Sequence, residues 1–316
     1  MIKYGILSTA SIVPRFVKAI RESENAEVVA IASREIEKSK KKAEELDIPK
    51  YYGTYEELYN DKQIDVIYIA TINFAHYQNI KDALNAGKHV VCEKPMVLEK
   101  SQAIELFNLA EEKGLFLAEA QKEVFLPITK KVKEIVETKE IGEIGLLDFA
   151  TSFPGDYNPW TLDLSKGGGV FFTNAVYCIE YIEFVIGKIT DYSGMRLISE
   201  EFKGDKECIL NFKIDNKTLA TSKISGYIQF QNKLVIYGTG GYIEIDNFYK
   251  ADKMTIHYYD EKEDKIINHP ASCEMTYEVN HFNNCIKKGK TTSDIITKDM
   301  TIHAVEILEN IQNSWK

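Results

Sequence analysis

The chain has 316 residues, of which 44% are hydrophobic, and a formal net charge of −9. This length and composition predict a soluble globular protein with a substantial core and about two domains. Because the net charge is negative and the lysines form no long basic block, we expect neither a nucleic-acid partner nor a membrane partner.

The cysteines and the N-terminus indicate where the protein works. The five cysteines are widely spaced and include no C-x-x-C pair, which favours reduced thiols and predicts no metal site. The stretch MIKYGILSTA is too short and too polar for a signal peptide, and no apolar run approaches the roughly 20 residues that span a bilayer. We therefore expect a cytoplasmic protein.

The first part of the chain alternates short apolar runs with amphipathic segments. The runs are IKYGILS, EVVAIAS, DVIYIAT, KHVVCEK and LFLAEA. Runs that are apolar almost throughout, such as 66–70, are typical of parallel strands covered by helices on both faces. Residues 1–120 are therefore expected to form an α/β Rossmann domain, a doubly wound parallel sheet with its ligand crevice at the carboxyl ends of the strands.

After residue 120 the pattern changes. An amphipathic helix over 127–142 precedes strand candidates, several of which alternate polar and apolar residues: IGLLDFATSF, CILNFKI, TLATSKI, KLVIYGT, YIEIDNF and MTIHYYD. Gly240 and Gly241 predict a hairpin turn. Residues 121–316 are expected to form an α+β domain with a large, mostly antiparallel open sheet. A C-terminal helix at about 297–315 is expected to pack back on this domain or on the Rossmann domain.

The turn after the first strand should hold the phosphates of a dinucleotide, but it departs from G-x-G-x-x-G. The sequence GILSTASIV places Ser8, Ala10 and Val13 where small residues are expected. Small side chains at the first two positions still allow close backbone approach beside a helix N-terminus. The predicted cofactor contacts are Ser8, Thr9, Ala10, Ser11 and Ile12. The alternative is a plain turn with Ser11 as the helix N-cap and Pro14 in the first helical turn.

The end of the second strand bears on the choice of cofactor. The first side chains beyond it are Ser33 and Arg34. A hydroxyl and a guanidinium suit the 2′-phosphate of NADP(H), whereas an NAD(H) site usually offers a carboxylate to the ribose hydroxyls. We expect NADP(H), and NAD(H) stays open as the alternative because Glu35 can serve those hydroxyls.

The stretch TINFAHYQNIKDALNAGKHVVCEKP at 71–95 carries the most specific motifs. It resembles the Gfo/Idh/MocA oxidoreductase family, whose members carry T-P-N-x-x-H after the fourth strand and A-G-K-H-V-x-x-E-K-P at the fifth. The matching residues are Thr71, Asn73, His76, Glu93, Lys94 and Pro95, and Ile72 replaces the usual proline. The resemblance implies cofactor contacts from Thr71, Asn73, His76, Glu93 and Lys94.

The resemblance also implies that Lys94 is catalytic and lies beside the nicotinamide and the substrate hydroxyl. Elementary chemistry supports this role, because an ammonium beside the positively charged nicotinamide has its charge disfavoured and can polarise a hydroxyl. The alternative is that Lys94 only pairs with Glu93 at the surface. Family members commonly associate through their open sheet, which implies a homodimer or homotetramer.

A second family signature, G-G-G-x-L-x-D-x-G-x-[HY], resembles GGGVFFTNAVYC at 167–178. The first three glycines and Tyr177 match, but Thr173 stands where the aspartate is expected and Ala175 replaces the fourth glycine. Tyr177 lies four residues after Thr173, so both can share one helix face. We expect Tyr177 to be the general acid or base, and Thr173 and Asn174 to contact the substrate.

A third stretch, EAQKEVFLP at 119–127, departs from E-A-x-W-x-R-F-x-P of several relatives. Gln121 becomes a candidate cofactor contact and Lys122 a candidate substrate contact. Both shift specificity away from the dihydrodiol dehydrogenase-like members, which the N-terminal half otherwise resembles. Tyr157 and Trp160, in SFPGDYNPW, can stack on a sugar ring, although Trp160 can equally anchor its loop.

Together these features predict an NADP(H)-dependent oxidoreductase that interconverts a hydroxyl and a carbonyl on a sugar, polyol or related small molecule by hydride transfer. One alternative is a nucleotide-binding regulator or sensor on the same fold, against which the retention of Lys94 and Tyr177 argues. Another is a hydride transfer internal to a redox-assisted elimination or glycoside cleavage.

Overall fold

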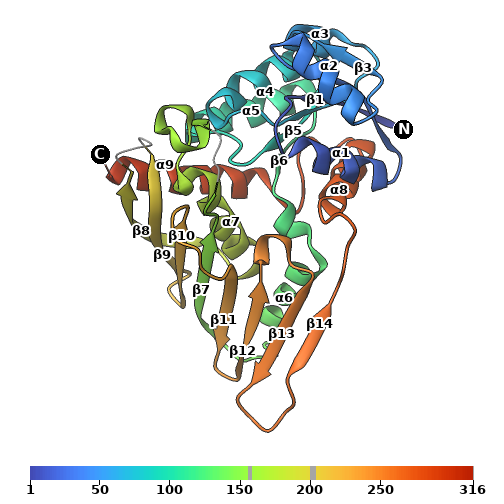
Figure 1. Cartoon of the computed structure of the whole chain (residues 1–316). Helices are drawn as coiled ribbons and strands as arrows, with labels where there is room; N and C mark the ends of the chain where they lie inside the picture. The colour runs from blue at the N-terminus through green and yellow to red at the C-terminus, as the bar shows by residue number, and fades with distance from the viewer. Residues whose placement is uncertain (156–158, 200–203, 316) are drawn as a thin grey trace. The chain divides into compact units, whose positions relative to one another are not determined.

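The computed structural model describes residues 1–155, 159–199 and 204–315, and the chain folds into two compact units (Figure 1). Unit 1 comprises Met1–Gln121 and Cys273–Ile302, and unit 2 comprises Lys122–Ser272 and His303–Lys316. None of the described helices is both long enough and apolar enough to cross a membrane.

Unit 1 contains the predicted parallel sheet, which is confirmed. Its six strands lie in the order β3-β2-β1-β4-β5-β6 and all neighbours pair in parallel. The strands are β1 Ile2–Leu7, β2 Ala26–Ala32, β3 Lys50–Tyr52, β4 Val66–Ile69, β5 His89–Glu93 and β6 Leu117–Ala120. The strand order reverses between β1 and β4, so the ligand crevice of this fold lies at their carboxyl ends.

The helices of unit 1 follow the expected alternation with the strands. They are α1 Val13–Glu22, α2 Ile36–Glu45, α3 Tyr55–Asn60, α4 His76–Asn85, α5 Lys100–Lys113 and α8 Thr276–Lys287, with a short 3-10 turn η1 Asn73–Ala75. The helix α8 comes from the segment Cys273–Ile302, which the sequence placed in the second domain. In this segment, Asn283 of α8 accepts from the Tyr4 hydroxyl of β1 at 2.8 Å, and the Thr291 carbonyl beyond the helix accepts from the Leu117 amide of β6 at 3.0 Å.

Unit 2 contains the predicted open sheet, with eight strands in the order β14-β13-β12-β11-β7-β10-β9-β8. All neighbours are antiparallel except β7 and β10, which are parallel. The strands are β7 Ile144–Ser152, β8 Ile189–Ile198, β9 Asp205–Ile214, β10 Thr218–Ser225, β11 Lys233–Gly238, β12 Gly241–Asp246, β13 Lys253–Tyr258 and β14 Lys265–Asn268.

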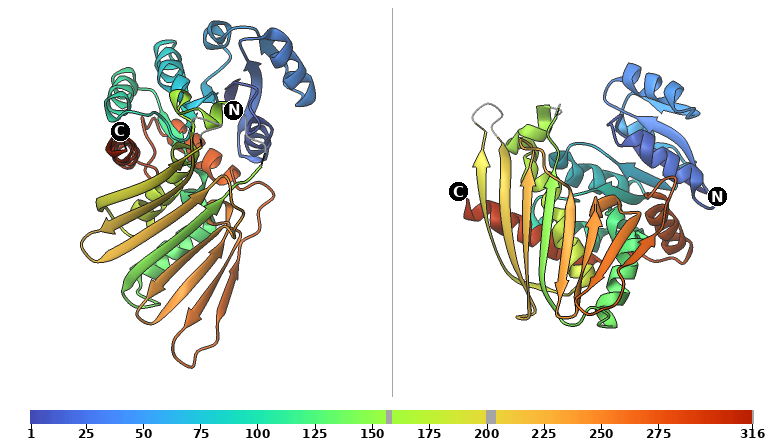
Figure 2. Two further views of the ribbon diagram at one scale, coloured as in Figure 1. Left: turned by 60° about the vertical axis from the view of Figure 1, so that its left-hand side comes forward. Right: turned by 60° about the horizontal axis from the view of Figure 1, so that its bottom comes forward.

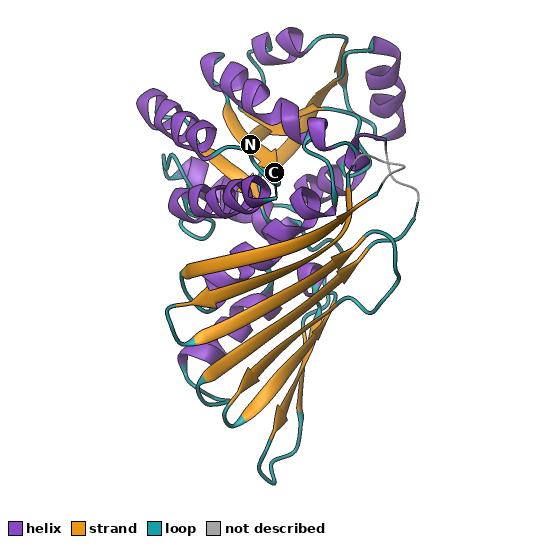
Figure 3. Cartoon of the chain, turned by 90° about the vertical axis from the view of Figure 1, so that its left-hand side faces the viewer, coloured by secondary structure: helices purple, strands orange, loops and turns teal. Residues whose placement is uncertain are grey.

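Helices lie on one face of this sheet, as Figure 2 shows, and Figure 3 turns the other face to the viewer. They are α6 Pro127–Glu137, α7 Val170–Val185 and α9 Lys298–Ser314, joined by the 3-10 turns η2 Lys122–Phe125, η3 Pro159–Leu162, η4 Leu164–Lys166 and η5 Phe248–Lys250. The core between helices and sheet includes Phe149 of β7, which meets Tyr181 of α7 and Phe248 of η5 edge to face at centroid distances of 5.8 and 5.1 Å. The helix α9 continues from unit 1, which ends at Ile302, into unit 2.

Candidate active site

The turn between β1 and α1 has the backbone of a dinucleotide-binding turn without its first glycine. Ser8 has a φ of 127°, a conformation that favours glycine. Its amide donates to the Ala32 carbonyl at 2.9 Å, and its hydroxyl accepts from the Ala10 amide at 3.1 Å. A non-glycine residue in this conformation is a strain that proteins tend to keep at functional sites.

The helix α1 begins without a side-chain cap. Its N-cap is Ile12, and no side chain bonds the first amides, so the alternative that Ser11 caps the helix is wrong. Pro14 does lie in the first turn. Uncapped amides at a helix N-terminus suit the pyrophosphate of a dinucleotide. The residues of this turn, Ser8, Thr9, Ala10, Ser11 and Ile12, are half-buried or exposed, and so open to a ligand.

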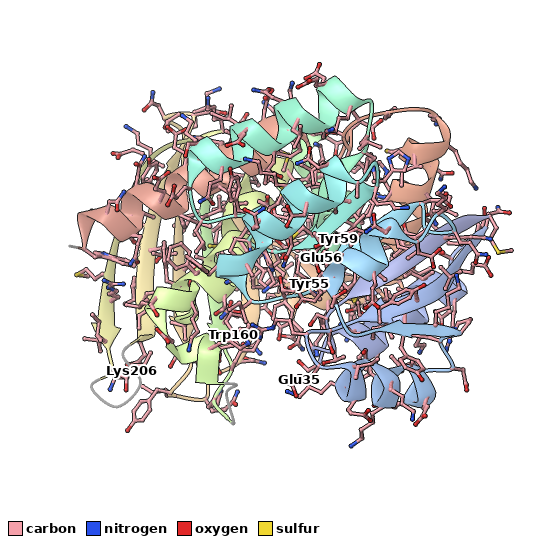
Figure 4. All side chains as sticks on the ribbon, turned by 90° about the horizontal axis from the view of Figure 1, so that it is seen from above. Glu35, Tyr55, Glu56, Tyr59, Trp160 and Lys206 are labelled. Carbon is pink, nitrogen blue, oxygen red and sulfur yellow. The ribbon has the colours of Figure 1, made fainter. Side chains whose placement is uncertain are left out.

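Three residues follow β2, namely Ser33, Arg34 and Glu35, and they differ in their hydrogen-bond and ion-pair partners. Ser33 is 7% exposed, and its hydroxyl donates to the Glu35 carbonyl at 2.7 Å. The Glu35 carboxylate receives Lys38 Nζ at 2.6 Å, whereas Arg34 is exposed. Burial raises the pKa of Tyr55 on α3, labelled with Glu35 in Figure 4, and the Arg34 guanidinium opposes that rise. The Arg34 guanidinium therefore provides a positive charge near a phenol at this end of the sheet.

His76 joins the two motif loops that follow β4 and β5. The side chain is fully buried, with Nδ1 3.0 Å from the Pro95 carbonyl and Nε2 3.1 Å from the Thr71 carbonyl. Burial lowers the pKa of His76, although both carbonyls favour its charged form. Asn79 fixes the same loop by donating to the Thr71 hydroxyl at 2.9 Å. His76 therefore joins the two loops, and the buried Asn73, 4% exposed, begins the turn η1 in the first of them.

The segment around Lys94 is fixed on both sides by buried groups. Glu93 accepts from the Tyr68 hydroxyl at 2.6 Å, and Tyr68 stacks on Phe16 of α1 with centroids 3.5 Å apart. On the other side, the Met96 amide donates to Glu119 Oε1 at 2.7 Å. Lys94 is half-buried between these anchors. The carboxylate of the neighbouring Glu93 is therefore directed toward Tyr68 of β4.

In unit 2, the triple glycine is required by two close approaches. A Cβ on Gly168 would strike the carbonyls of Trp160 and Asp163, and a Cβ on Gly169 would strike the carboxylate of Asp205. Gly169 also has a φ of 95°. The Asp205 carboxylate, 1% exposed, accepts from the Phe171 amide at 2.7 Å and so binds the N-terminus of α7.

The first turns of α7 carry the three predicted residues of this unit. The Thr173 hydroxyl donates to the Gly169 carbonyl at 2.7 Å and accepts from Asn174 Nδ2 at 2.9 Å. Both side chains are half-buried and bonded within the helix. Tyr177 is 7% exposed, and its oxygen accepts from Lys122 Nζ at 2.9 Å. The sequence proposed these two residues for one site without indicating that they touch.

Two of the remaining predicted residues lie where the chain passes from unit 1 to unit 2. Gln121, the last residue of unit 1, is fully buried, and Lys122, the first of unit 2, is 6% exposed. Trp160, labelled in Figure 4, lies on η3, whose backbone packs against the glycines. Tyr157 lies outside the described residues. Sequence reasoning missed Asp205, which binds the N-terminus of α7, and Tyr249, which packs on Tyr177, because both come from segments without a motif.

One group of side chains could in principle hold a metal ion. His281 and Cys285, one turn apart on α8, lie with Asp294 so that their ligand atoms are all within 4.8 Å. His281 Nε2 is already 2.9 Å from the Ser293 hydroxyl, and Lys290 pairs with Asp294 at 2.5 Å. The Lys290 ammonium disfavours a cation there, and ordinary hydrogen bonds account for the arrangement.

Comparison with known families assigns both parts of the chain. The model for an oxidoreductase family with an NAD-binding Rossmann fold, GFO_IDH_MocA, matches residues 2–139. The model for the GFO/IDH/MocA C-terminal domain matches residues 129–244. The two matches together run through both units.

Individual relatives are similar over nearly the whole chain. A trans-1,2-dihydrobenzene-1,2-diol dehydrogenase from Xenopus laevis is 30% identical over 306 residues, which cover 93% of this chain and 92% of that protein. The mouse (Mus musculus) protein of the same name is 27% identical over 326 residues, which cover 99% of this chain and 96% of that protein.

Two solved structures share the fold at lower identity. One is a 3-ketoreductase from Actinomadura kijaniata in complex with NADP and TDP-benzene. Its TM-score is 0.89 at 20% identity, and the match covers 99% of this chain and 97% of that chain. The other is a levoglucosan dehydrogenase in complex with NADH and levoglucosan, with a TM-score of 0.88, 16% identity and coverage of 99% and 96%.

Proposed function

Because the chain belongs to the Gfo/Idh/MocA family of NAD(P)-dependent oxidoreductases, we propose that it interconverts a hydroxyl and a carbonyl on a sugar, polyol or related small molecule. Relatives named for a diol, a 3-keto group and levoglucosan support this substrate class. When bound, the nicotinamide accepts or donates the hydride, and the residues of the chain bind the substrate and move the proton.

The observation that carries this proposal is the fixed segment around Lys94. Tyr68, His76 and Glu119, all buried, bind Glu93, Pro95 and Met96 respectively. A lysine that only paired with its neighbour at the surface would not need three buried anchors. A lysine that donates to a substrate oxygen does, because its donor must be positioned to within a fraction of an ångström.

The proposed roles follow the motifs. Lys94 donates to the reacting oxygen, and Tyr177 takes or returns its proton. The residues proposed to bind the cofactor are Ser8, Thr9, Ala10, Ser11, Ile12, Ser33, Arg34, Thr71, Asn73, Glu93, Lys94 and Gln121, with His76 acting through the loops it joins. Lys122, Trp160, Thr173 and Asn174 are proposed for the substrate side together with Tyr177.

NADP(H) is the proposed cofactor. Glu35, the residue that could serve the ribose hydroxyls of NAD(H), is paired with Lys38, while the exposed Arg34 is available to a 2′-phosphate. The five cysteines are free and buried, which supports the expectation of a reducing, cytoplasmic environment.

We further propose a homodimer or homotetramer formed through the outer face of the eight-stranded sheet. Apolar side chains on that face are unusually exposed, including Met195 at 68%, Ile209 at 44% and Leu219 at 56%. Cross-strand pairing aligns Met195 with Ile209 and Leu219 with Leu146, so they share one face. Such clusters mark surfaces that associate.

The experiment is calorimetric titration of nucleotide-free protein with NADPH and NADH, followed by an absorbance screen of sugars and polyols. Tight NADPH binding, weaker NADH binding and net oxidation or reduction of one compound are expected. Binding without turnover of any compound would favour a sensor. Release of a leaving group without net cofactor consumption would favour a redox-assisted elimination.

A further inference from the structure

The side chains of Lys122 and Tyr177 form a fixed pair inside unit 2. Lys122 Nζ donates to the Tyr177 oxygen at 2.9 Å and lies 4.7 Å from the centroid of that ring. It also lies 5.9 Å from the centroid of Tyr249. With 6% and 7% of their surfaces exposed, neither Lys122 nor Tyr177 is a freely moving surface group.

The surroundings hold the pair in this geometry. Tyr177 packs on Tyr249 with centroids 5.7 Å apart, and the Tyr249 hydroxyl accepts from Asn232 Nδ2 at 3.1 Å. The π faces of two rings offset part of the cost of keeping an ammonium out of water. Lys122 is the first residue of the turn η2, and only Gln121 separates it from the end of β6, so it does not lie on a long loop.

We propose that Lys122 is a positioning residue that activates Tyr177 for proton transfer, a role that rests on the proposed function of Tyr177. An ammonium that donates to a phenol oxygen stabilises the phenolate relative to the phenol. The charge beside the tyrosine then comes from a lysine, whereas Thr173, at the family's aspartate position, uses its hydroxyl to bond the Gly169 carbonyl.

The proton balance in the oxidising direction is simple. The proton of the substrate hydroxyl moves to the Tyr177 phenolate, which becomes a phenol. The carbon that bears this hydroxyl gives its hydride to the oxidised nicotinamide and becomes a carbonyl carbon. Lys122 keeps its protons throughout and donates to the same oxygen before and after the transfer. The reducing direction reverses these steps.

Other titratable groups near Tyr177 act on the same side of α7. Glu123 of η2 is negatively charged when ionised, so its effect on Tyr177 opposes that of Lys122. Burial raises the pKa of Tyr181 and of Cys178, and the Glu123 carboxylate contributes to both increases. Lys250 of η5 lies 5.9 Å from the Tyr249 ring. These groups are unchanged by a substitution at Lys122, so a comparison of variants isolates the lysine.

The first test is ultraviolet titration of tyrosinate in protein without substrate or cofactor. The chain has 18 tyrosines, so the signal of Tyr177 is the difference between each protein and its Tyr177→Phe counterpart. In Lys122→Met this signal should appear about one to three pH units higher than in the wild type, and Lys122→Arg should restore most of the change. An unchanged signal in Lys122→Met would overturn the inference, whatever the activity.

The second test uses the pH dependence of kcat/KM for oxidation of the compound found in the screen. The acid limb should move to higher pH in Lys122→Met and return in Lys122→Arg. A lysine that serves only packing would lower activity at every pH without moving the limb, and that result would also overturn the inference. If Lys122→Met does not fold, Lys122→Gln takes its place. A shifted tyrosinate signal in a protein with no turnover would show that Lys122 stabilises the Tyr177 phenolate, and would overturn the proposed function and with it the role in proton transfer.

Discussion

Lys94 illustrates how much of the proposed chemistry depends on one side chain. It is half-buried on a segment that three buried residues fix, so replacing it removes a donor without removing its support. Lys94→Ala should lower turnover by about 10²- to 10⁴-fold, the usual contribution of a positioned acid or base. The NADPH dissociation constant, measured by calorimetry, should change only a few-fold.

The matched control for that substitution is Lys113→Ala, which removes an exposed lysine from the last turn of α5 in the same unit. Its turnover should equal that of the wild type. Turnover of Lys94→Ala at the wild-type level would exclude Lys94 from the mechanism.

Arg34 is the residue on which the choice of cofactor depends. A charge-assisted hydrogen bond to the 2′-phosphate contributes roughly 1.5–3 kcal/mol, or about ten-fold or more in affinity. Arg34→Ala should therefore weaken NADPH binding by at least about ten-fold and leave NADH binding nearly unchanged. Lys41→Ala, which removes an exposed charge from the neighbouring helix α2, controls for general electrostatic attraction. Equal losses for both nucleotides would contradict the 2′-phosphate assignment.

At the scale of elements, His76 couples the loops after β4 and β5, and this coupling should depend on pH. Because burial lowers its pKa, the folded protein keeps His76 neutral at a pH where the unfolded chain, with an ordinary value near 6.5, binds a proton. Stability from this residue is complete above about pH 6.5 and is lost as the pH falls from there toward the lower folded value.

His76→Gln should remove this dependence. Between pH 7.5 and 5.5, urea unfolding followed by circular dichroism should show a shallower loss of stability than in the wild type, by up to about 1.4 kcal/mol per pH unit. Comparing slopes rather than absolute stabilities allows for the cost of the substitution itself, and His89, whose pKa burial also lowers, is present in both proteins. Parallel slopes would show that His76 does not titrate between the two states.

The N-terminus of α7 depends on the glycine at position 169. An alanine there would need a φ near 95° and would strike the Asp205 carboxylate that binds the helix N-terminus. Gly169→Ala should destabilise unit 2 by at least about 1–3 kcal/mol. Both tryptophans, Trp160 and Trp315, lie in unit 2, so their fluorescence during urea unfolding reports this unit.

Gly145→Ala provides the comparison, because a Cβ on Gly145 in β7 meets open space. Its unfolding midpoint should stay within experimental error of the wild type. A midpoint for Gly169→Ala as high as that of Gly145→Ala would mean that the glycine turn is not rigid.

The elements that the sequence predicted correctly are those with a strong periodic signal. Five strands of unit 1, all except β3, are mostly buried and read as apolar runs, and the six predicted strands of unit 2 alternate buried with more exposed residues. The strands β3, β8 and β14 were not predicted. The strand β3 has three residues, none of them buried, β8 is interrupted by Gly194, where a Cβ would strike Leu210, and β14 is a short, mostly exposed edge. The motif residues were found because they are close in sequence, whereas Asp205 reaches the glycine turn from a distant strand.

The pair of Lys122 and Tyr177 shows the same limit at the site. Both residues were candidates, but 55 positions separate them, and no local pattern fixes a contact at that distance in sequence. The placement of Cys273–Ile302 in unit 1 was missed for a similar reason, because its contacts, such as Tyr4 with Asn283 and Phe116 with Phe282, join residues far apart in the sequence.

For the whole molecule, the outer face of the eight-stranded sheet sets the expected assembly. On this face the apolar Met195, Ile209 and Leu219 are mixed with ion pairs such as Lys223 with Asp148 at 2.6 Å. A surface of this kind loses water-exposed apolar area when a second copy covers it, while the paired charges fix the register. We therefore expect the wild-type protein to be a dimer or tetramer in solution.

The substitutions Met195→Glu and Ile209→Glu, made together, place two like charges directly opposite each other on neighbouring strands of that face. Burying them against another copy would cost far more than leaving them in water, so light scattering after gel filtration should give the mass of a single chain. Both positions lie in unit 2, as do both tryptophans, so an unfolding midpoint by tryptophan fluorescence that shows a folded unit 2 separates loss of assembly from loss of folding. Ile104→Glu on α5, which changes an exposed apolar residue of unit 1, should leave the mass at its wild-type value. A wild-type protein that elutes as a single chain would contradict the interface, and a double variant that keeps its full mass would place the interface on another surface.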